Sequence, residues 1–236
     1  MTTNNSTQAI IQVEGVTKTF NPDTIPVQAL RGVDLTIGQG EFTALVGPSG
    51  SGKTTLLNAI GGLDLPSTGT ITINDQDIGQ LSDNELIEFR KQHIGFVFQA
   101  YNLIPVLTAK ENVEFVMLSQ GKTATEREAR VQELLKAVGL EAEIDRRPAQ
   151  LSGGQQQRVA VARALASKPM FVLADEPTAN LDSKSTTNLL DIMAQLNREE
   201  NITFLFSTHD QRVIDRARRV VTLEDGKIVS DVKVDA

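Results

Sequence analysis

The sequence predicts an α/β fold in which a core sheet is accompanied by an antiparallel β layer and interrupted by an inserted helical subdomain. Three observations lead to this prediction. Apolar and polar residues alternate near the N-terminus as in half-buried strands, the middle of the chain has helical spacing, and strands alternate with helices in the last third. A chain of 236 residues can bury a large core, as one elaborated domain or as two lobes.

The antiparallel layer is expected in the first part of the chain. Apolar positions alternate with polar ones in three runs, which contain Ile11, Val13 and Val16, then Val33, Leu35 and Ile37, and then Ile71 and Ile73. Between these runs, residues 41–46 indicate a buried strand and residues 54–60 a helix. Ser82 and Glu85 have the spacing of a capping box, which predicts a short helix ahead of a strand at residues 94–98.

The helical segment follows directly. Thr108 with Glu111, and Thr125 with Glu128, have the same capping-box spacing, so each threonine is expected to begin a helix. Gly139 is expected to end the second of these helices, because glycine favours the left-handed conformation found at helix ends.

After Pro169 the pattern returns to alternating elements, with strands at residues 171–174 and 202–206, a helix at 183–199 and a final hairpin at Asp225-Gly226. We therefore expect a single domain over residues 1–236. Its α/β core comprises residues 1–98 and 168–236, and its helical subdomain comprises residues 99–167.

Residues 47–54, Gly-Pro-Ser-Gly-Ser-Gly-Lys-Thr, have the pattern of a phosphate-binding P-loop between a predicted strand and a predicted helix. Such a turn directs backbone N–H groups at phosphate oxygens, and the helix that follows adds its positive N-terminal dipole. Lys53 is expected to reach the β- and γ-phosphates of ATP, and Thr54 to offer its hydroxyl to Mg²⁺. The core is thus predicted to be that of a P-loop NTPase, with nucleotide contacts from Gly47, Pro48, Ser49, Gly50, Ser51, Gly52, Lys53, Thr54 and Thr55.

The predicted strand at residues 171–174 leads into two acids, Asp175 and Glu176. Ligands of α/β folds usually bind beyond the carboxyl ends of the strands, so both acids are expected at the site. Asp175 is expected to hold Mg²⁺, directly or through water, and Glu176 to polarise the water that attacks the γ-phosphate. A solvated pair of loop carboxylates is the alternative, and the P-loop in the same chain favours the catalytic interpretation. These residues predict an ATPase.

A second anion site is indicated by Ser152, Gly153, Gly154 and Gln155, which begin another predicted helix. A serine cap followed by two glycines exposes backbone N–H groups at a helix N-terminus. The γ-phosphate of another ATP molecule is the obvious ligand. The alternative is an ordinary capping box formed by Ser152 and Gln155.

Composition limits the choice of partners. The chain has no cysteine, and its net charge is −7, which argues against a nucleic-acid surface. The first eight residues are polar and uncharged, so we do not expect a signal peptide. The apolar runs are far too short to cross a bilayer, so any membrane role is expected to come through a partner.

In their order, these motifs resemble those of the nucleotide-binding subunits of ATP-binding cassette (ABC) transporters, over nearly the whole chain. Residues 151–155, here called the signature turn, correspond to the signature motif of that family. The resemblance extends to Gln99, to the Asn180-Leu181-Asp182 loop and to His209.

The resemblance implies further roles for these residues. Gln99 would sense Mg²⁺ and the attacking water, and His209 would contact the γ-phosphate. Asp182 would lie at the seam of a twofold dimer with a second copy of the chain, and Ser152 would cap the ATP held by the opposite subunit. Phe20 stands where the family commonly has a tyrosine that stacks on adenine, and its aromatic face keeps that ability.

Residues 99–108, followed by Glu111-Asn112-Val113, resemble a narrower group: the ATPases of lipoprotein-releasing, macrolide-exporting and cell-division complexes, which drive separately encoded membrane subunits. The resemblance implies a subunit that powers transport or extraction by ATP-driven dimerisation. It would lie on the cytoplasmic side of the inner (plasma) membrane, bound to its membrane partner between Tyr101 and Leu107. Leu103, Ile104, Val106 and Leu107 are expected to be exposed apolar residues of this segment, with Leu103, Ile104 and Leu107 in contact with the partner. The alternative is that they are ordinary core residues. A conformational switch or scaffold without transport is the alternative function.

Overall fold

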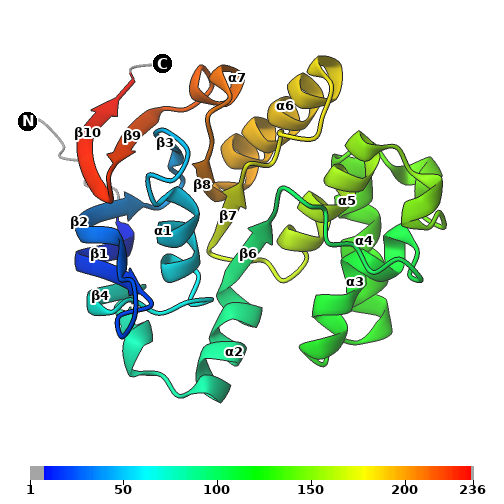
Figure 1. Ribbon diagram of the computed structural model, residues 1–236. Helices are drawn as coiled ribbons and strands as arrows, with labels where there is room; N and C mark the ends of the chain where they lie inside the picture. Colours follow the sequence, from blue (N-terminus) through cyan, green and yellow to red (C-terminus); the bar gives the residue numbers. More distant parts are fainter. Residues whose placement is uncertain (1–7, 235–236) are drawn as a thin grey trace, which may run out of the picture.

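The structure, a computed structural model, describes residues 8–234 and contains two β sheets and a group of helices (Figure 1). Most of the polar N-terminal segment, residues 1–7, lies outside the described residues. The first sheet is antiparallel, in the order β2-β1-β4-β5. Its strands are β1 (Ala9–Phe20), β2 (Val27–Gly38), β4 (Thr68–Ile73) and β5 (Gln76–Asp77). The predicted antiparallel layer is therefore confirmed.

The second sheet carries the core and has the order β10-β9-β3-β8-β7-β6. Its strands are β3 (Phe42–Val46), β6 (Ile94–Val97), β7 (Phe171–Asp175), β8 (Thr203–Ser207), β9 (Arg219–Glu224) and β10 (Lys227–Lys233). All neighbours are parallel except β9 and β10, which form the predicted hairpin. The carboxyl ends of β3, β6, β7 and β8 consequently meet at one edge of this sheet, although they are far apart in the sequence.

The helices fall into two groups. Those that follow core strands or join them are α1 (Lys53–Ile60), α2 (Asp83–His93), α6 (Ser183–Glu200) and α7 (Gln211–Ile214). Three others, α3 (Ala109–Ser119), α4 (Ala124–Ala137) and α5 (Gly153–Leu165), are consecutive in the sequence and pack against one another. Figure 1 shows them on the right, beside β6 and β7. Short 3₁₀ turns complete the chain at Ile78–Gln80, Glu141–Glu143 and Pro148–Gln150.

The start of α4 corrects the sequence prediction. Its capping box is formed by Thr123 and Glu126, not by Thr125 and Glu128. The same Thr-x-x-Glu pattern occurs twice, two residues apart, and the helix begins at the earlier of the two. With this start, Glu128 faces outward from the second turn of the helix, where it forms an ion pair with Lys110 of α3. The earlier start thus gains an ion pair that joins α4 to α3.

Two hydrophobic clusters hold the layers together. One lies between the core sheet and the helical group, and contains Phe42, Phe204 and Phe206 with residues of α3, α4, α5 and α6. The other joins the antiparallel sheet and α1 to the core sheet, and includes Ile11, Ile37 and Leu45. None of the helices in residues 8–234 is both long and apolar enough to span a membrane.

Candidate functional site: a P-loop cavity and a separate signature turn

The P-loop connects β3 to α1 and depends on glycine at two close approaches. Gly47 has a φ of +149°, and a Cβ there would lie 2.0 Å from the carbonyl oxygen of Leu223. Gly52 has a φ of +105°, and its Cβ would lie 2.6 Å from the carbonyl oxygen of Ala29. A side chain at either position would clash with the backbone of a neighbouring segment. These contacts fix the path of the loop ahead of the N-terminus of α1.

Lys53, the first residue of α1, is held over the loop. Its ammonium donates hydrogen bonds to the carbonyl oxygens of Gly47 at 2.8 Å and Pro48 at 3.0 Å. The Oγ atom of Ser51 is buried and has no hydrogen-bond partner. A buried hydroxyl without a partner carries a free-energy penalty, which a phosphate oxygen would relieve. The loop therefore fits a phosphate group in both charge and donor supply.

A cavity of about 590 Å³, here called the P-loop cavity, opens beside this loop. It brings together residues from five segments of the chain. Its lining consists of Ala29, Gly47, Pro48, Ser49, Gly50, Gly52, Lys53, Thr54, Thr55, Gln99, Glu176, Ala179, Ser207 and His209. Most of the residues predicted to contact nucleotide in this chain lie here. Ser207 was missed by the sequence analysis, although a polar residue at the end of the apolar strand β8 was a usable signal.

Asp175, which does not itself line the cavity, contacts Thr54 of the cavity lining. The Thr54 hydroxyl lies 3.1 Å from Oδ1 and 3.0 Å from Oδ2 of Asp175, within hydrogen-bond distance of both. Oxygen donors of this kind suit Mg²⁺, which is usually bound by one or two protein oxygens together with phosphates and water. Within the described residues, no cluster of three or more His, Cys, Asp and Glu side chains is placed to hold a metal ion. A magnesium ion here would take the rest of its ligands from phosphate and water.

Glu176 is held in an unusual backbone conformation next to His209. Its φ is +46°, in the left-handed region that is costly for residues with a side chain. Its N–H donates to the carbonyl oxygen of Ser207 at 2.8 Å, which ties the turn to the end of β8. Nδ1 of His209 lies 2.7 Å from Oε1 of Glu176. The carboxylate is thus oriented by a partner from the segment that follows β8, as a catalytic base requires.

The residues after His209 fix this wall of the cavity. Asp210 caps α7, and the buried hydroxyl of Thr178 donates to its Oδ2 at 2.9 Å. The guanidinium of Arg212, together with the Arg212 backbone N–H and Thr178, lowers the pKa of Asp210 to about 2. Asp210 therefore links the turn after Glu176 to the turn that carries His209.

The signature turn lies outside the P-loop cavity. Ser152, Gly154 and Gln155 line a smaller hollow of about 210 Å³ that also contains Arg158 and Lys184. Ser152 and Gln155 form the expected capping box, with hydrogen bonds of 2.9 and 3.3 Å. The capping interpretation is therefore correct as local geometry, and it leaves the N-terminus of α5 facing outward.

The two glycines of the turn lie close to side chains from neighbouring segments. A Cβ on Gly153 would lie 2.7 Å from the Tyr101 hydroxyl, and one on Gly154 would lie 2.7 Å from Oγ of Ser185. Asp182 caps the neighbouring helix α6 by accepting a 2.9 Å hydrogen bond from the N–H of Ser185. The starts of α5 and α6 are thus packed side by side.

Comparison with known proteins agrees with this geometry. The sequence matches the family described as "ABC transporter" over residues 30–179. The chain belongs to this family. It is 49% identical over 221 residues to "Lipoprotein-releasing system ATP-binding protein LolD 1" of Rhodopseudomonas palustris, an alignment that covers 93% of this chain and 98% of the relative. It is 45% identical over 226 residues to "Macrolide export ATP-binding/permease protein MacB" of Marinobacter nauticus, covering 96% of this chain and 35% of that longer protein.

Among solved structures, the ATP-binding cassette MJ0796, as a dimer in a post-hydrolysis state bound to ADP and Pi, matches with a TM-score of 0.88 and 43% identity. The match covers 96% of this chain and all of that chain. This chain is therefore an ABC-type ATPase, a subunit that binds and hydrolyses ATP. The family resemblance and the predicted P-loop NTPase fold are both confirmed.

Phe20 and the segment between Tyr101 and Leu107 lie away from the P-loop cavity of this ABC ATPase. Phe20, at the end of β1, is 38% exposed and does not line the cavity, and the ammonium of Lys18 lies 5.3 Å from the centre of its ring. Leu103 packs against the cluster under the helical group, and Ile104 and Leu107 are half-buried. The expectation of exposed apolar residues between Tyr101 and Leu107 is thus met only by Val106, which is 72% exposed. Core packing accounts for Leu103.

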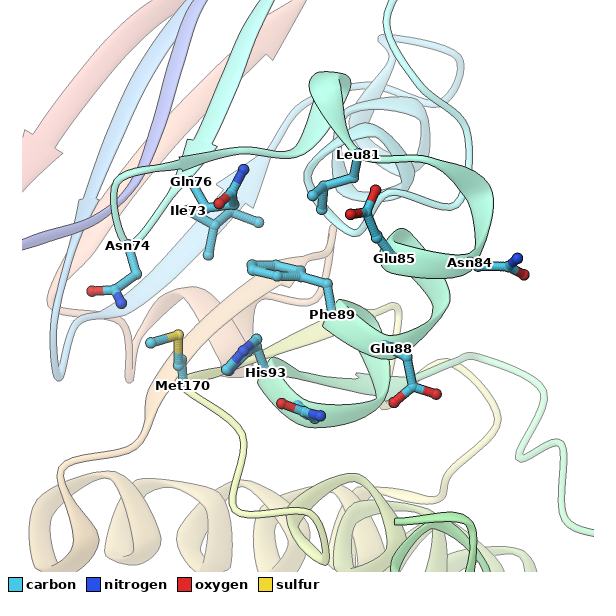
Figure 2. Close-up of a pocket in the computed structure, with 11 residues that line it drawn as sticks. Ile73, Asn74, Gln76, Leu81, Asn84, Glu85, Glu88, Phe89, His93 and Met170 are labelled. Atoms are coloured by element: carbon cyan, nitrogen blue, oxygen red, sulfur yellow. The ribbon is translucent and has the colours of Figure 1, made fainter.

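A second hollow, of about 570 Å³, lies between α2 and β4 (Figure 2). Phe89, His93 and Met170 turn toward it, and the rings of Phe89 and His93 are 4.7 Å apart. Burial lowers the pKa of His93. The two carboxylates at its rim are engaged by neighbours, Glu85 by Ser82 and Glu88 by Lys91. His93 is thus a packing residue, and the hollow supplies no catalytic pair.

Proposed function

We propose that the P-loop backbone and Lys53 bind the phosphates of ATP, and that Thr54, Asp175 and Gln99 hold Mg²⁺ between them. The oxygen atoms of Thr54 and Asp175, 3.0 Å apart beside the P-loop, support this assignment. When bound, the ion would offset the charge that develops on the phosphates. The remaining P-loop residues contribute backbone donors, and Thr55 lines the cavity beside them.

Glu176 orients the attacking water in this proposal, and His209 keeps the Glu176 carboxylate in position beside the γ-phosphate. The observation that carries this role is the 2.7 Å contact between the two side chains within the cavity that the P-loop lines. Phosphoryl transfer needs positioning and charge stabilisation more than covalent help, so an oriented carboxylate suffices. Gln99, at the rim of the same cavity, would sense both the ion and the water.

Two copies of the chain are proposed to share each ATP. The P-loop cavity holds the phosphate-binding residues, whereas Ser152, Gly153, Gly154 and Gln155 stand outside it with a helix N-terminus available to an anion. A twofold dimer would place the signature turn of one copy against the ATP of the other, with Asp182 at the seam and Phe20 against adenine. The dimeric state of the similar cassette supports this arrangement.

The membrane partner is proposed to dock on the segment between Tyr101 and Leu107. Buried Asn112 holds this segment through hydrogen bonds to Ile104, Leu107 and Thr108. Arg163 of α5 donates to the carbonyl of Tyr101 at 3.0 Å. The segment is therefore a fixed surface joined directly to Gln99, with Val106 at its exposed tip. It would place the subunit peripherally, on the cytoplasmic side of the inner (plasma) membrane.

The complex is proposed to resemble those of the lipoprotein-releasing and macrolide-export relatives, with this ATPase driving a membrane subunit that moves or extracts a substrate. A second candidate function is that of a conformational switch in a membrane complex of the cell-division type. That function would use all of the residues discussed above. The two functions differ in whether a substrate moves.

The docking surface is tested with Val106→Asp. A charge at the centre of a desolvated contact typically costs more than about 2 kcal/mol, so this variant should fail to co-purify with its membrane subunit. Val229→Asp is the matched control, since Val229 is also an exposed valine (57%) but lies on β10. Normal co-purification of the Val106 variant would place the partner elsewhere on the subunit.

Transport is separated from switching by measuring substrate movement in vesicles that contain the whole complex. ATP-dependent release or export, lost with Glu176→Gln, supports transport. Hydrolysis without any substrate movement, combined with an ATP-dependent change in the shape of the complex, would support the switch.

A further inference from the structure

Gln157 is a buried side chain that none of the roles above uses. It lies on α5, one turn after the start of the helix, and is 0% exposed. Its amide nitrogen donates to two backbone carbonyls, that of Phe98 at 3.2 Å and that of Pro177 at 2.8 Å. Both acceptors are carbonyl oxygens, which only accept, so the amide must face them with its nitrogen.

The two acceptors adjoin the catalytic residues. Phe98 directly precedes Gln99, and Pro177 directly follows Glu176. Strands β6 and β7 are parallel neighbours, so their carboxyl ends lie side by side and one amide can bridge both turns. Figure 1 shows α5 beside these two strands. Gln157 is therefore the point at which the helix of the signature turn is bonded to both catalytic segments.

The other half of the amide is left unsatisfied. Oε1 of Gln157 is buried and has no hydrogen-bond partner among the described residues. A buried acceptor without a partner carries a free-energy penalty, which offsets part of the stability that the two donated hydrogen bonds contribute. The amide is therefore an inefficient device for stability alone, whereas a need to hold the two carbonyls in place accounts for it directly.

We propose that Gln157 is a positioning residue for ATP hydrolysis, which rests on the roles proposed for Gln99 and Glu176. It fixes the backbone on either side of these two residues to the helix that carries Ser152 to Gln155. A phosphate bound at the signature turn thereby restrains the two turns that orient the attacking water. The chemistry depends on geometry to within about an ångström, and misplacement on that scale can lower the rate by ~10²-fold.

The test compares Gln157→Met with Asn197→Leu. Methionine keeps the length of the side chain and removes the donor. Asn197 is a matched control, because it is also a buried amide (3% exposed) that donates to two backbone carbonyls, Gly40 at 3.0 Å and Ile202 at 2.6 Å. Those acceptors lie before β3 and β8, at the opposite edge of the sheet from the P-loop cavity.

The rate is expressed per molecule of bound ATP, so that loss of folded protein does not count as loss of catalysis. Gln157→Met should lower kcat per bound ATP by about tenfold or more while the Kd for ATP stays within about twofold. Asn197→Leu should lower the unfolding temperature but leave kcat per bound ATP unchanged. A Gln157→Met variant that turns over as fast as the control would overturn the positioning role.

If Gln157→Met does not fold, Gln157→Asn tests the proposal instead. The asparagine side chain is one methylene shorter, so its amide loses at least one of the two hydrogen bonds. It should fall between the parent and the methionine variant in kcat, and a parental kcat would reject the proposal. Glu176→Gln is measured in the same series. If that variant hydrolyses ATP normally, the catalytic assignment itself has failed; if it is inactive while the Gln157 variants are normal, only the positioning role has failed.

Discussion

The P-loop cavity and the signature turn are both built to meet phosphate, and they are built differently. The cavity gathers residues from five segments of the chain, including Lys53, Glu176 and His209, and the backbone is strained at Glu176. The signature turn consists of neutral residues close together in the sequence, and its hydrogen bonds join Ser152 to Gln155, three residues away. One site depends on the whole fold, whereas the other is a local helix start.

This difference indicates which of the two sites takes its geometry from a single chain. Strain and charge are tolerated only where surrounding structure determines the geometry, so the cavity is the part that the single chain finishes. The signature turn is formed by local hydrogen bonds, and its helix N-terminus faces outward. This arrangement suits a surface that binds a second copy of the chain. The comparison predicts that damage to the cavity should stop chemistry, and that damage to the signature turn should stop assembly.

Glu176→Gln gives the largest expected effect. Loss of a group that orients the attacking water commonly lowers the rate by ~10²–10⁴-fold, while the P-loop contacts that bind ATP are retained. Phosphate release measures the rate, and fluorescent nucleotide titration measures binding. Glu14→Gln, on the exposed face of β1, is the matched control. Turnover above about a tenth of the parent rate would remove Glu176 from this role.

Ser152→Arg should act on assembly. In the Glu176→Gln background, ATP should drive the chain from monomer to dimer, and the arginine should weaken that dimer at least tenfold, or by ~1.4 kcal/mol. Light scattering with and without ATP measures the shift. Thr123→Arg removes an equivalent capping box at the start of α4, so it controls for the loss of a helix cap. Equal dimerisation by the Ser152 variant would refute the shared-ATP arrangement.

The contrast between local and long-range contacts also explains which features could be predicted from the sequence. The P-loop, the acids at the end of β7 and the capping box at Ser152 were predictable, because each is a short pattern with a local physical cause. Thr125 was chosen wrongly as a helix cap because Thr123 offers the same local pattern. The choice between them involves the contact of Glu128 with Lys110, which lies in another helix.

Long-range contacts set the limit of prediction. Leu103 has no periodicity that separates a docking residue from a core residue, and only packing against the helical cluster decides its position. The position of Gln157 against Phe98 and Pro177 requires the parallel pairing of β6 and β7. Ser207 and Asp210 likewise acquire their roles from neighbours that are far away in the sequence.

The smallest expected effect is a difference in acid sensitivity between the two sites. Next to His209 of the cavity, Asp210 forms an ion pair with Arg212, and the pKa of Asp210 is lowered to about 2. An aspartate in an unfolded chain has a pKa of about 3.9, so the ion pair contributes stability above about pH 4 and loses it as the pH falls toward 2. The neutral hydrogen bonds of Ser152 and Gln155 have no such dependence.

Urea unfolding between about pH 5 and about pH 2 measures this difference. The parent should lose stability over that window, and Asp210→Asn should lose less, because it lacks the carboxylate that must be protonated. Asp215→Asn is the matched control, since Asp215 follows the same short helix and its carboxylate accepts a 2.7 Å hydrogen bond from the neutral amide of Gln211. If Asp210→Asn follows the parent curve across the whole window, the ion pair does not stabilise the cavity wall, and the contrast in charge between the two sites has no energetic consequence.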